Sequence, residues 1–297
     1  MNVAGSDRAL KVTWGLMRFL GRFSSHLSGP VADKLWFTPW RVPLSDRARS
    51  KQQGWLAALE QRRFHVGDLD VNAYVGGSGP TVMLVHGWGD SAGSLGAFID
   101  PLLDANHRVV AIDLPAHGGS PGDRTDAFVA ATAVRGISDQ IGGVAAVIAH
   151  SMGALATIVA LHEGLRPDAA VVMAPSVDLE HAMDKFAAMF SVPPKAIRGL
   201  RASIERRYGK TVWRDLAADA LVREVDVPTL IIHDRADAQV DVADAERLAT
   251  AWAGSHLEIT DGLSHTKIVR DPKVVGGAVG FVKARISDAS PIPAPMR

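Results

Sequence analysis

VIAHSMGALATIV, residues 147–159, is the most informative stretch of the sequence. An apolar run typical of a strand ends at Ser151 and passes directly into a helical pattern. A serine on such a sharp turn needs small residues two positions before it and two after it, because the backbones pack closely there. Ala149 and Gly153 meet that need. The turn would expose the Ser151 hydroxyl at the N-terminus of a helix, whose partial positive charge favours a developing anion. We therefore expect Ser151 to be a nucleophile.

Short apolar runs recur on both sides of this stretch and alternate with helical patterns. Several of them are continuous, as expected for parallel strands covered on both faces. The alternation predicts right-handed βαβ units, and hence an α/β fold with a doubly wound, mostly parallel sheet. The expected strands are residues 81–85, 108–112, 144–149, 169–173, 229–232 and 256–259, and the expected helices include residues 155–163 and 242–252. Residues 64–67 and 71–76 predict an antiparallel hairpin at one edge.

The same patterns divide the chain into zones. Residues 63–176 and 227–286 carry the strands and are expected to form the core. Residues 177–226 are helical without strands and predict a short helical cap, while residues 1–62 predict an N-terminal helical extension. Residues 287–297, SDASPIPAPMR, have the composition of a disordered tail.

Composition excludes several classes of protein. Lys and Arg total 32, and so do Asp and Glu, so the balance does not predict nucleic-acid binding. Cysteine is absent, which excludes a thiol nucleophile, a Cys-ligated zinc and a disulfide framework. No uncharged apolar run is long enough to predict a transmembrane helix. Basic residues interrupt the first apolar stretch, unlike the centre of a secretory signal, so we expect a cytoplasmic protein.

Two glycine-rich loops follow expected strands. In LVHGWGDSA, residues 84–92, the glycines would let the backbone approach a substrate carbonyl without an intervening Cβ; the alternative is a plain glycine-rich turn. In AIDLPAHGGS, residues 111–120, we expect Asp113 and His117 to fix the conformation of the loop and to take no part in catalysis.

Two later loops offer an acid and a base. IIHDRADAQVD, residues 231–241, contains Asp234 and Asp237, and ITDGLSHTKIVRDP, residues 259–272, contains His265 after the last expected strand. At the carboxyl ends of parallel strands, such side chains are brought to one edge of the sheet. We expect His150 and His233 to be packing or supporting residues.

These motifs together resemble the α/β-hydrolase superfamily, and in particular its serine esterases and lipases. Residues 149–153 resemble the nucleophile elbow, with alanine for the usual first glycine. Residues 86–89 resemble the His-Gly-x-Gly oxyanion loop, and residues 113–120 resemble the Asp-x-x-Gly-His-Gly-x-Ser loop with Ala116 for a glycine. Residues 233–240 resemble His-Gly-x-x-Asp-x-x-Val, which places Asp237 at the acid and Asp234 at the glycine. The resemblance covers about residues 64 to 285.

The resemblance implies a catalytic triad and an oxyanion hole. Ser151 would be the nucleophile, His265 the general base and Asp237, in preference to Asp234, the acid that orients the histidine. The order serine, aspartate, histidine along the chain is the order of this fold. The backbone N–H groups of Trp88 and Met152 would form the oxyanion hole. A nucleophilic aspartate, as in haloalkane dehalogenases and epoxide hydrolases of this fold, is excluded because position 151 is serine.

The expected activity is hydrolysis of carboxylic esters with short to medium acyl chains, through an acyl-enzyme. A small-molecule ester is then the substrate, and neither a metal nor an organic cofactor is needed. C–C bond, thioester or lactone hydrolysis on the same triad stays open, as do a membrane-surface lipase and a non-catalytic ligand receptor.

Two surfaces have open interpretations. Met183, Phe186, Met189 and Phe190 follow helical spacing and would line an acyl pocket with Trp88, or would pack the cap on the body. Residues 10–27 carry a basic stripe beside a broad apolar surface. That segment could make weak contact with an anionic membrane surface, but docking on its own domain is the preferred interpretation.

Overall fold

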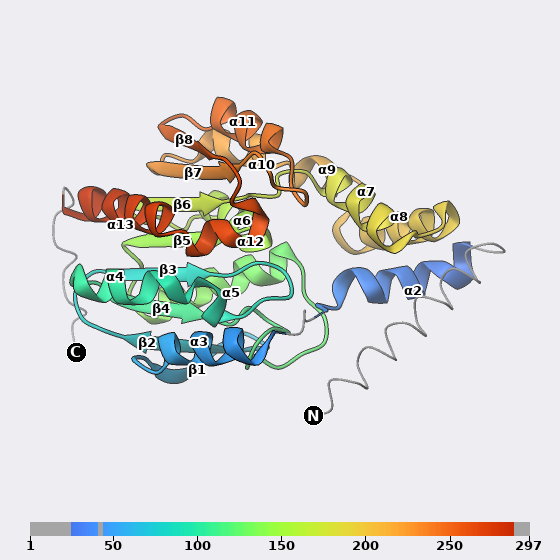
Figure 1. Ribbon diagram of the computed structural model, residues 1–297. Helices are drawn as coiled ribbons and strands as arrows, with labels where there is room; N and C mark the ends of the chain where they lie inside the picture. Colours follow the sequence, from blue (N-terminus) through green and yellow to red (C-terminus); the bar gives the residue numbers. More distant parts are fainter. Residues whose placement is uncertain (1–24, 41–43, 288–297) are drawn as a thin grey trace. The chain divides into compact units, whose positions relative to one another are not determined.

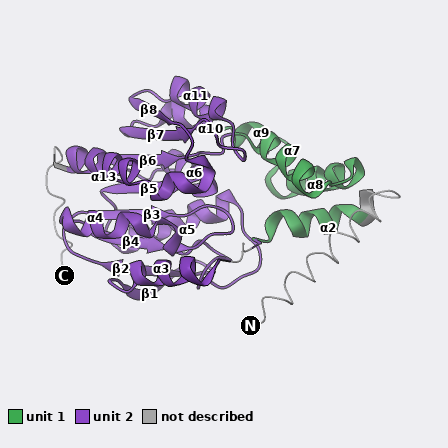
Figure 2. Ribbon diagram, viewed as in Figure 1, with its two compact units in different colours: residues 1–39, 178–217 green, residues 40–177, 218–297 purple. Residues whose placement is uncertain are grey.

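The computed structural model describes residues 25–40 and 44–287. They form two compact units, each described here by itself (Figure 2). The described part of unit 1 comprises residues 25–39 and Asp178–Ala217, and that of unit 2 comprises Trp40, residues 44–177 and residues 218–287. No helix among these residues combines the length and the apolar character needed to cross a membrane.

The sheet of unit 2 has eight strands in the order β1-β2-β4-β3-β5-β6-β7-β8 (Figure 1). The strands are β1 (Glu60–Val66), β2 (Leu69–Gly76), β3 (Thr81–Val85), β4 (Arg108–Ile112), β5 (Ala146–His150), β6 (Ala169–Met173), β7 (Thr229–Asp234) and β8 (Ser255–Thr260). β1 pairs with β2, and β2 with β4, in antiparallel fashion, and all other pairs are parallel. The prediction of a doubly wound, mostly parallel sheet is therefore confirmed.

Three strands have the expected bounds, whereas others extend further at their carboxyl ends. β5 runs to His150, which pairs with Met173, and β7 runs to Asp234, which pairs with Thr260. Ladder hydrogen bonds continue there although the apolar pattern stops. The extra residues are polar, although buried, and they lie at the carboxyl ends of the strands, where the loops begin.

Helices cover both faces of the sheet. The helices of unit 2 are α3 (Asp46–Leu56), η1 (Ala92–Phe98), α4 (Ile99–Asp104), α5 (Ala127–Gln140), α6 (Met152–His162), α10 (Ala218–Leu221), η2 (Val222–Glu224), α11 (Val242–Ala251), α12 (Ser264–Lys267), η3 (Ile268–Arg270) and α13 (Pro272–Ser287). η1, α4 and α13 pack together over one face, and α5, α6 and α11 belong to the layer on the other (Figure 1). Consequently the central strands are buried on both sides, which explains their continuous apolar sequences.

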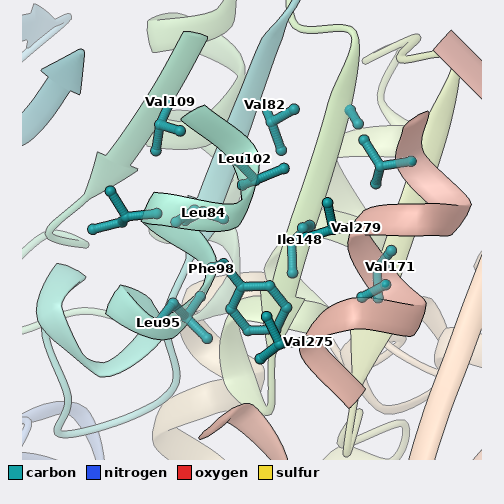
Figure 3. Close-up of a cluster of buried hydrophobic side chains, with 14 of the residues drawn as sticks. Val82, Leu84, Leu95, Phe98, Leu102, Val109, Ile148, Val171, Val275 and Val279 are labelled. Carbon is teal, nitrogen blue, oxygen red and sulfur yellow. The ribbon is translucent and has the colours of Figure 1, made fainter. Parts of the chain in front are cut away.

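One cluster of buried aliphatic and aromatic side chains joins the sheet to η1, α4 and α13 (Figure 3). Leu84 and Ile148 from the strands meet Phe98 from η1 and Val275 from α13. Burying each such side chain contributes about 1.5–3 kcal/mol before the entropy cost of folding. This core fixes the positions of the strand ends from which the functional loops begin.

Unit 1 combines an early segment of the chain with an insertion. It contains α2 (Ser25–Phe37), α7 (Leu179–Phe190), α8 (Pro194–Tyr208) and α9 (Val212–Asp215). α2 and α8 touch at two glycines, since a Cβ on Gly29 would lie 2.9 Å from Gly199 Cα. The Ser203 hydroxyl donates to Asp33 Oδ1 at 2.8 Å, and the Trp36 and Phe186 rings meet edge to face at 5.2 Å.

The units divide the expected zones differently from the sequence patterns. Within the expected N-terminal extension, α2 belongs to unit 1 whereas α3 belongs to unit 2. Within unit 2, Trp55 of α3 lies so close to Gly96 of η1 that a Cβ there would be 2.4 Å from the indole. The insertion leaves unit 2 at Val177 and returns at Ala218, where the Ala218 N–H donates to the Val177 carbonyl at 3.0 Å. Residues 1–24 and 288–297 lie outside the described residues, and so do the predictions made for them. These include most of the expected basic stripe of residues 10–27 and the expected disordered tail.

Candidate active site

Ser151 lies between β5 and α6 in a strained backbone conformation. Its φ is 54° and its ψ is −121°, which is unusual for a residue with a Cβ. The Ser151 N–H donates to the Met173 carbonyl at 2.9 Å, which fixes the turn to β6. A Cβ on Gly153 would lie 2.3 Å from the His86 carbonyl oxygen, so glycine is required two residues after the serine. Close packing of α6 on the end of β3 thus explains this part of the motif.

His265 lies in α12, on a turn that Asp234 anchors. The Asp234 carboxylate accepts hydrogen bonds from the Leu263 N–H at 2.9 Å, the Ser264 N–H at 2.8 Å and the Thr260 hydroxyl at 2.7 Å. Although burial opposes ionisation, these bonds and one from the Ala236 N–H hold the pKa of Asp234 below its usual range. Asp234 therefore fixes the loop that presents the histidine.

Ser151, His265 and Asp237 form a continuous chain of hydrogen bonds. His265 Nδ1 lies 2.7 Å from Asp237 Oδ2, and His265 Nε2 lies 3.0 Å from Ser151 Oγ. The His265 side chain is 9% exposed and the Asp237 side chain is fully buried. Because a carboxylate can only accept, Nδ1 carries the proton and Nε2 is left to accept from the serine hydroxyl.

The Asp237 carboxylate is held in its charged form. Burial raises its pKa, but hydrogen bonds from His265, Val240 and Gln239 outweigh burial, so the pKa lies below the usual range. The two backbone N–H groups donate to Oδ1 at 3.0 Å and 2.8 Å, which leaves Oδ2 for the histidine. His233 supports the same loop through its Nε2, 3.1 Å from the Val240 carbonyl.

One expected oxyanion donor, Met152, follows Ser151 directly, and the other, Trp88, lies in the loop after β3. Met152 is the first residue of α6, so its N–H has no partner within the helix. In the loop after β3, the Gly89 N–H donates to His117 Nε2 at 3.0 Å, and no described residue accepts a hydrogen bond from the Trp88 N–H. A Cβ on Gly87 would lie 3.1 Å from Ser151 Cβ, so glycine allows this loop to approach the nucleophile.

Asp113 and His117 are occupied in holding that loop. The Asp113 carboxylate accepts from the Ala92 N–H at 2.7 Å, the Gly119 N–H at 2.8 Å and the Asn72 side-chain amide at 2.9 Å. Both ring nitrogens of His117 are bonded, Nδ1 to the Pro115 carbonyl and Nε2 to Gly89. Both carboxylate oxygens of Asp113 and both ring nitrogens of His117 thus have hydrogen-bond partners, and the absence of a catalytic role for them stays a prediction. Asn72 was not among the expected residues, because its only signal in the sequence is an amide in a mainly apolar strand.

The apolar residues of α7 differ in exposure. Met183 and Phe186 are buried, and the Phe186 ring contacts those of Trp36 and Phe190 within unit 1. Met189 is 62% exposed. Packing inside unit 1 thus accounts for Phe186, while contact of α7 with an acyl chain stays a prediction.

Within the described residues, no group of three or more His, Asp or Glu side chains is arranged to hold a metal ion. The arrangement around Ser151 can instead activate a hydroxyl, stabilise an oxyanion and relay a proton.

The model of the alpha/beta hydrolase family matches residues 82–276, about two thirds of the chain. The protein therefore belongs to the alpha/beta hydrolase family.

Solved structures of the same fold include esterases and lipases. An esterase from Pyrococcus furiosus superposes with a TM-score of 0.64 at 20% identity, covering 84% of this chain and 97% of that one. A putative lipase from Acinetobacter baumannii gives 0.63 at 16% identity, covering 84% and 99%. At these identities the likeness shows the fold alone.

Two curated relatives match over short stretches. A fluoroacetate dehalogenase from a Burkholderia species is 43% identical over 62 residues, which is 21% of this chain and 20% of that protein. A pimeloyl-[acyl-carrier protein] methyl ester esterase from Methylococcus capsulatus is 51% identical over 45 residues, 15% of this chain and 17% of that protein. The matches thus span about a fifth or less of these relatives' lengths.

Proposed function

We propose that the protein is a serine hydrolase that cleaves carboxylic esters of short to medium acyl chains. The observation that carries the proposal is the hydrogen-bonded chain from Ser151 through His265 to the buried Asp237. Membership of a hydrolase family, and the fold shared with esterases and lipases, support it.

In the first step the Ser151 hydroxyl attacks the ester carbonyl carbon while its proton passes to His265 Nε2. The imidazolium that forms is stabilised by the Asp237 carboxylate, whose lowered pKa keeps it charged. The Trp88 and Met152 N–H groups donate to the oxyanion, and each such donor contributes roughly 3 kcal/mol where it has been measured. Collapse of the tetrahedral intermediate expels the alcohol, which takes the proton from His265.

In the second step water attacks the acyl-enzyme. His265 Nε2 accepts a proton from the water, the same N–H groups stabilise the second oxyanion, and the carboxylic acid leaves as Ser151 regains its proton. Every proton transfer runs through one imidazole, so the reaction requires neither a metal nor an organic cofactor.

Displacement of halide is disfavoured despite the short match to a fluoroacetate dehalogenase. That reaction on this fold uses a nucleophilic aspartate, and position 151 is serine. Hydrolysis of thioesters, lactones or C–C bonds uses the same groups, and a broader substrate panel separates these reactions from ester hydrolysis.

A p-nitrophenyl ester series from acetate to palmitate tests the proposal, with Ser151→Ala as the control. We expect hydrolysis that peaks at short or medium chains and is lost in Ser151→Ala. Activity that peaks at palmitate and rises with emulsified substrate would instead indicate a membrane-surface lipase. No hydrolysis of any ester, together with no covalent labelling of Ser151 by a fluorophosphonate, would refute the proposal and favour a non-catalytic receptor.

A further inference from the structure

The residue before the proposed nucleophile contacts two other segments of the site. His150 ends β5 and is buried, with 3% of its surface exposed. Its Nε2 lies 2.9 Å from the carbonyl oxygen of His265. The two imidazole rings also pack against each other, with their centroids 4.7 Å apart and their planes tilted by 47°.

The ring of His150 also lies against the oxyanion loop. A Cβ built on Gly87 would be 3.1 Å from His150 Nδ1, so the ring lies directly beside the Gly87 backbone. His150 is thus bonded covalently to Ser151, hydrogen-bonded to the backbone of His265 and in contact with the loop that carries the Trp88 N–H. It joins three segments that a productive geometry must keep in register.

His150 donates to a carbonyl oxygen, so its Nε2 carries the proton. Burial, reinforced by the neighbouring His265, lowers the pKa of His150 to about 3, and the ring is neutral at physiological pH. A charged ring here would repel the imidazolium that forms on His265 during catalysis. The neutral ring can hold His265 without opposing its protonation.

We infer that His150 is a positioning residue: by holding the His265 carbonyl and packing on its ring, it sets the angle at which His265 faces both Ser151 and Asp237. The inference rests on the proposed function for its consequence in turnover, but its effect on His265 is independent of any substrate. The titratable groups around His265 are Asp237, Asp90 and His150, with His86 beyond His150 and Arg270 beside Asp90.

Two substitutions separate the parts of this role. His150→Phe keeps a flat ring but removes the donor, and His150→Gln keeps an N–H donor but removes the ring. The matched control is His162→Phe, which removes a bond of the same kind, from His162 Nδ1 to the Leu221 carbonyl at 3.2 Å, at the far end of α6.

With the donor lost, we expect kcat to fall about 10- to 100-fold in His150→Phe, while KM changes less than about threefold. The hydrogen bond between His265 Nδ1 and Asp237 should weaken, which moves the NMR signal of its proton. His150→Gln should recover most of kcat, and His162→Phe should match the wild type in kcat.

The NMR chemical shift of the His265 Nδ1 proton, recorded at one fixed pH, reports the hydrogen bond to Asp237 without substrate. It should move in His150→Phe and stay near the wild-type position in His150→Gln and His162→Phe. The inference fails if folded His150→Phe keeps the wild-type kcat and the wild-type position of this signal. It also fails if His150→Gln loses as much kcat as His150→Phe. Should His150→Phe not fold, His150→Gln decides alone: a signal at the wild-type position supports the inference and a displaced one overturns it. Absence of ester turnover in the wild type would count against the proposed function and leave the NMR comparison to judge His150.

Discussion

Two regions at the same edge of the sheet each combine an aspartate with a histidine, and their hydrogen bonds differ in one respect. In the loop after β4, Asp113 accepts three hydrogen bonds and both nitrogens of His117 are bonded to the backbone. In the loops after β7 and β8, one carboxylate oxygen of Asp237 accepts hydrogen bonds from the backbone, and the other accepts one from His265. Among the described residues, the Ser151 hydroxyl is then the one hydrogen-bond partner of His265 Nε2. A histidine at this edge can act as a base when one ring nitrogen is left for the nucleophile, and it acts as a brace when both are tied to the chain.

The largest expected effect comes from replacing Asp237, the proposed acid of the triad. Asp237→Asn should lower kcat about 10⁴-fold, because the amide no longer selects the tautomer with Nε2 free. The comparison variant is Asp234→Asn, which should keep kcat within about tenfold while losing stability, since Asp234 holds the turn and not the imidazole. Steady-state kinetics and thermal melts of both variants decide the matter. Inactive Asp234→Asn with active Asp237→Asn would reverse the assignment of the acid.

In the loop after β4, which contains Asp113 and His117, a substitution of Asp113 should lower stability and leave turnover nearly unchanged. Asp113→Asn places an amide N–H against backbone donors, so we expect a loss of about 3 kcal/mol in the free energy of unfolding. Turnover per folded molecule should change little, because Asp113 touches no reacting atom. Urea denaturation combined with titration of active sites separates the two quantities. A kcat loss as large as that of Asp237→Asn, without a loss of stability, would show that Asp113 is not a brace.

Asp90 differs both from Asp237, which is bonded to a histidine, and from Asp113, which is bonded to backbone and amide donors. It follows directly after residues 86–89, and no described residue donates a hydrogen bond to its side chain. Burial raises its pKa from 3.8 to about 6, against the opposing charges of Arg270 and His265. A raised pKa in the folded state means that stability falls as pH rises from about 4 through 6. Asp90→Asn should therefore gain about 2 kcal/mol at pH 7.5 and gain nothing below pH 4. Denaturant titrations at the two pH values test this. An equal gain at both would exclude ionisation as the cause.

The smallest expected effect concerns Ala116, in the loop after β4. Its φ is 65°, in the left-handed region that disfavours a Cβ. Ala116→Gly should raise the free energy of unfolding by up to about 1 kcal/mol and leave kcat unchanged. The melting temperature, compared with that of the wild type in one buffer, reports the change. Destabilisation would mean that the buried Cβ contributes more by packing than its backbone conformation costs.

Local sequence carried much of the fold because the central strands of unit 2 are short apolar runs that are followed by polar loops. Ser151, Asp237 and His265 could be picked out by their positions after strands, and the structure brings them within hydrogen-bond distance. The residues against which α2 packs could not be predicted in the same way. The contact of Gly29 with Gly199 and that of Trp36 with Phe186 join residues more than a hundred positions apart, and neither glycine nor tryptophan specifies its partner. The hydrogen bond from His150 to His265 depends likewise on the exact end of β5.

The hydrogen bond between Ala218 and Val177 has a consequence for the engineering of this chain. From the side of unit 2, the forty-residue excursion of Asp178–Ala217 starts and finishes at one spot, so its removal leaves a gap that a tight turn could close. At such a point the whole insert could be exchanged for another without disturbing the register of β6 and β7. In this chain the exchange would have a second requirement: α2 has its packing partner in α8, so a transplanted insert would have to bring, or do without, a companion for residues 25–37.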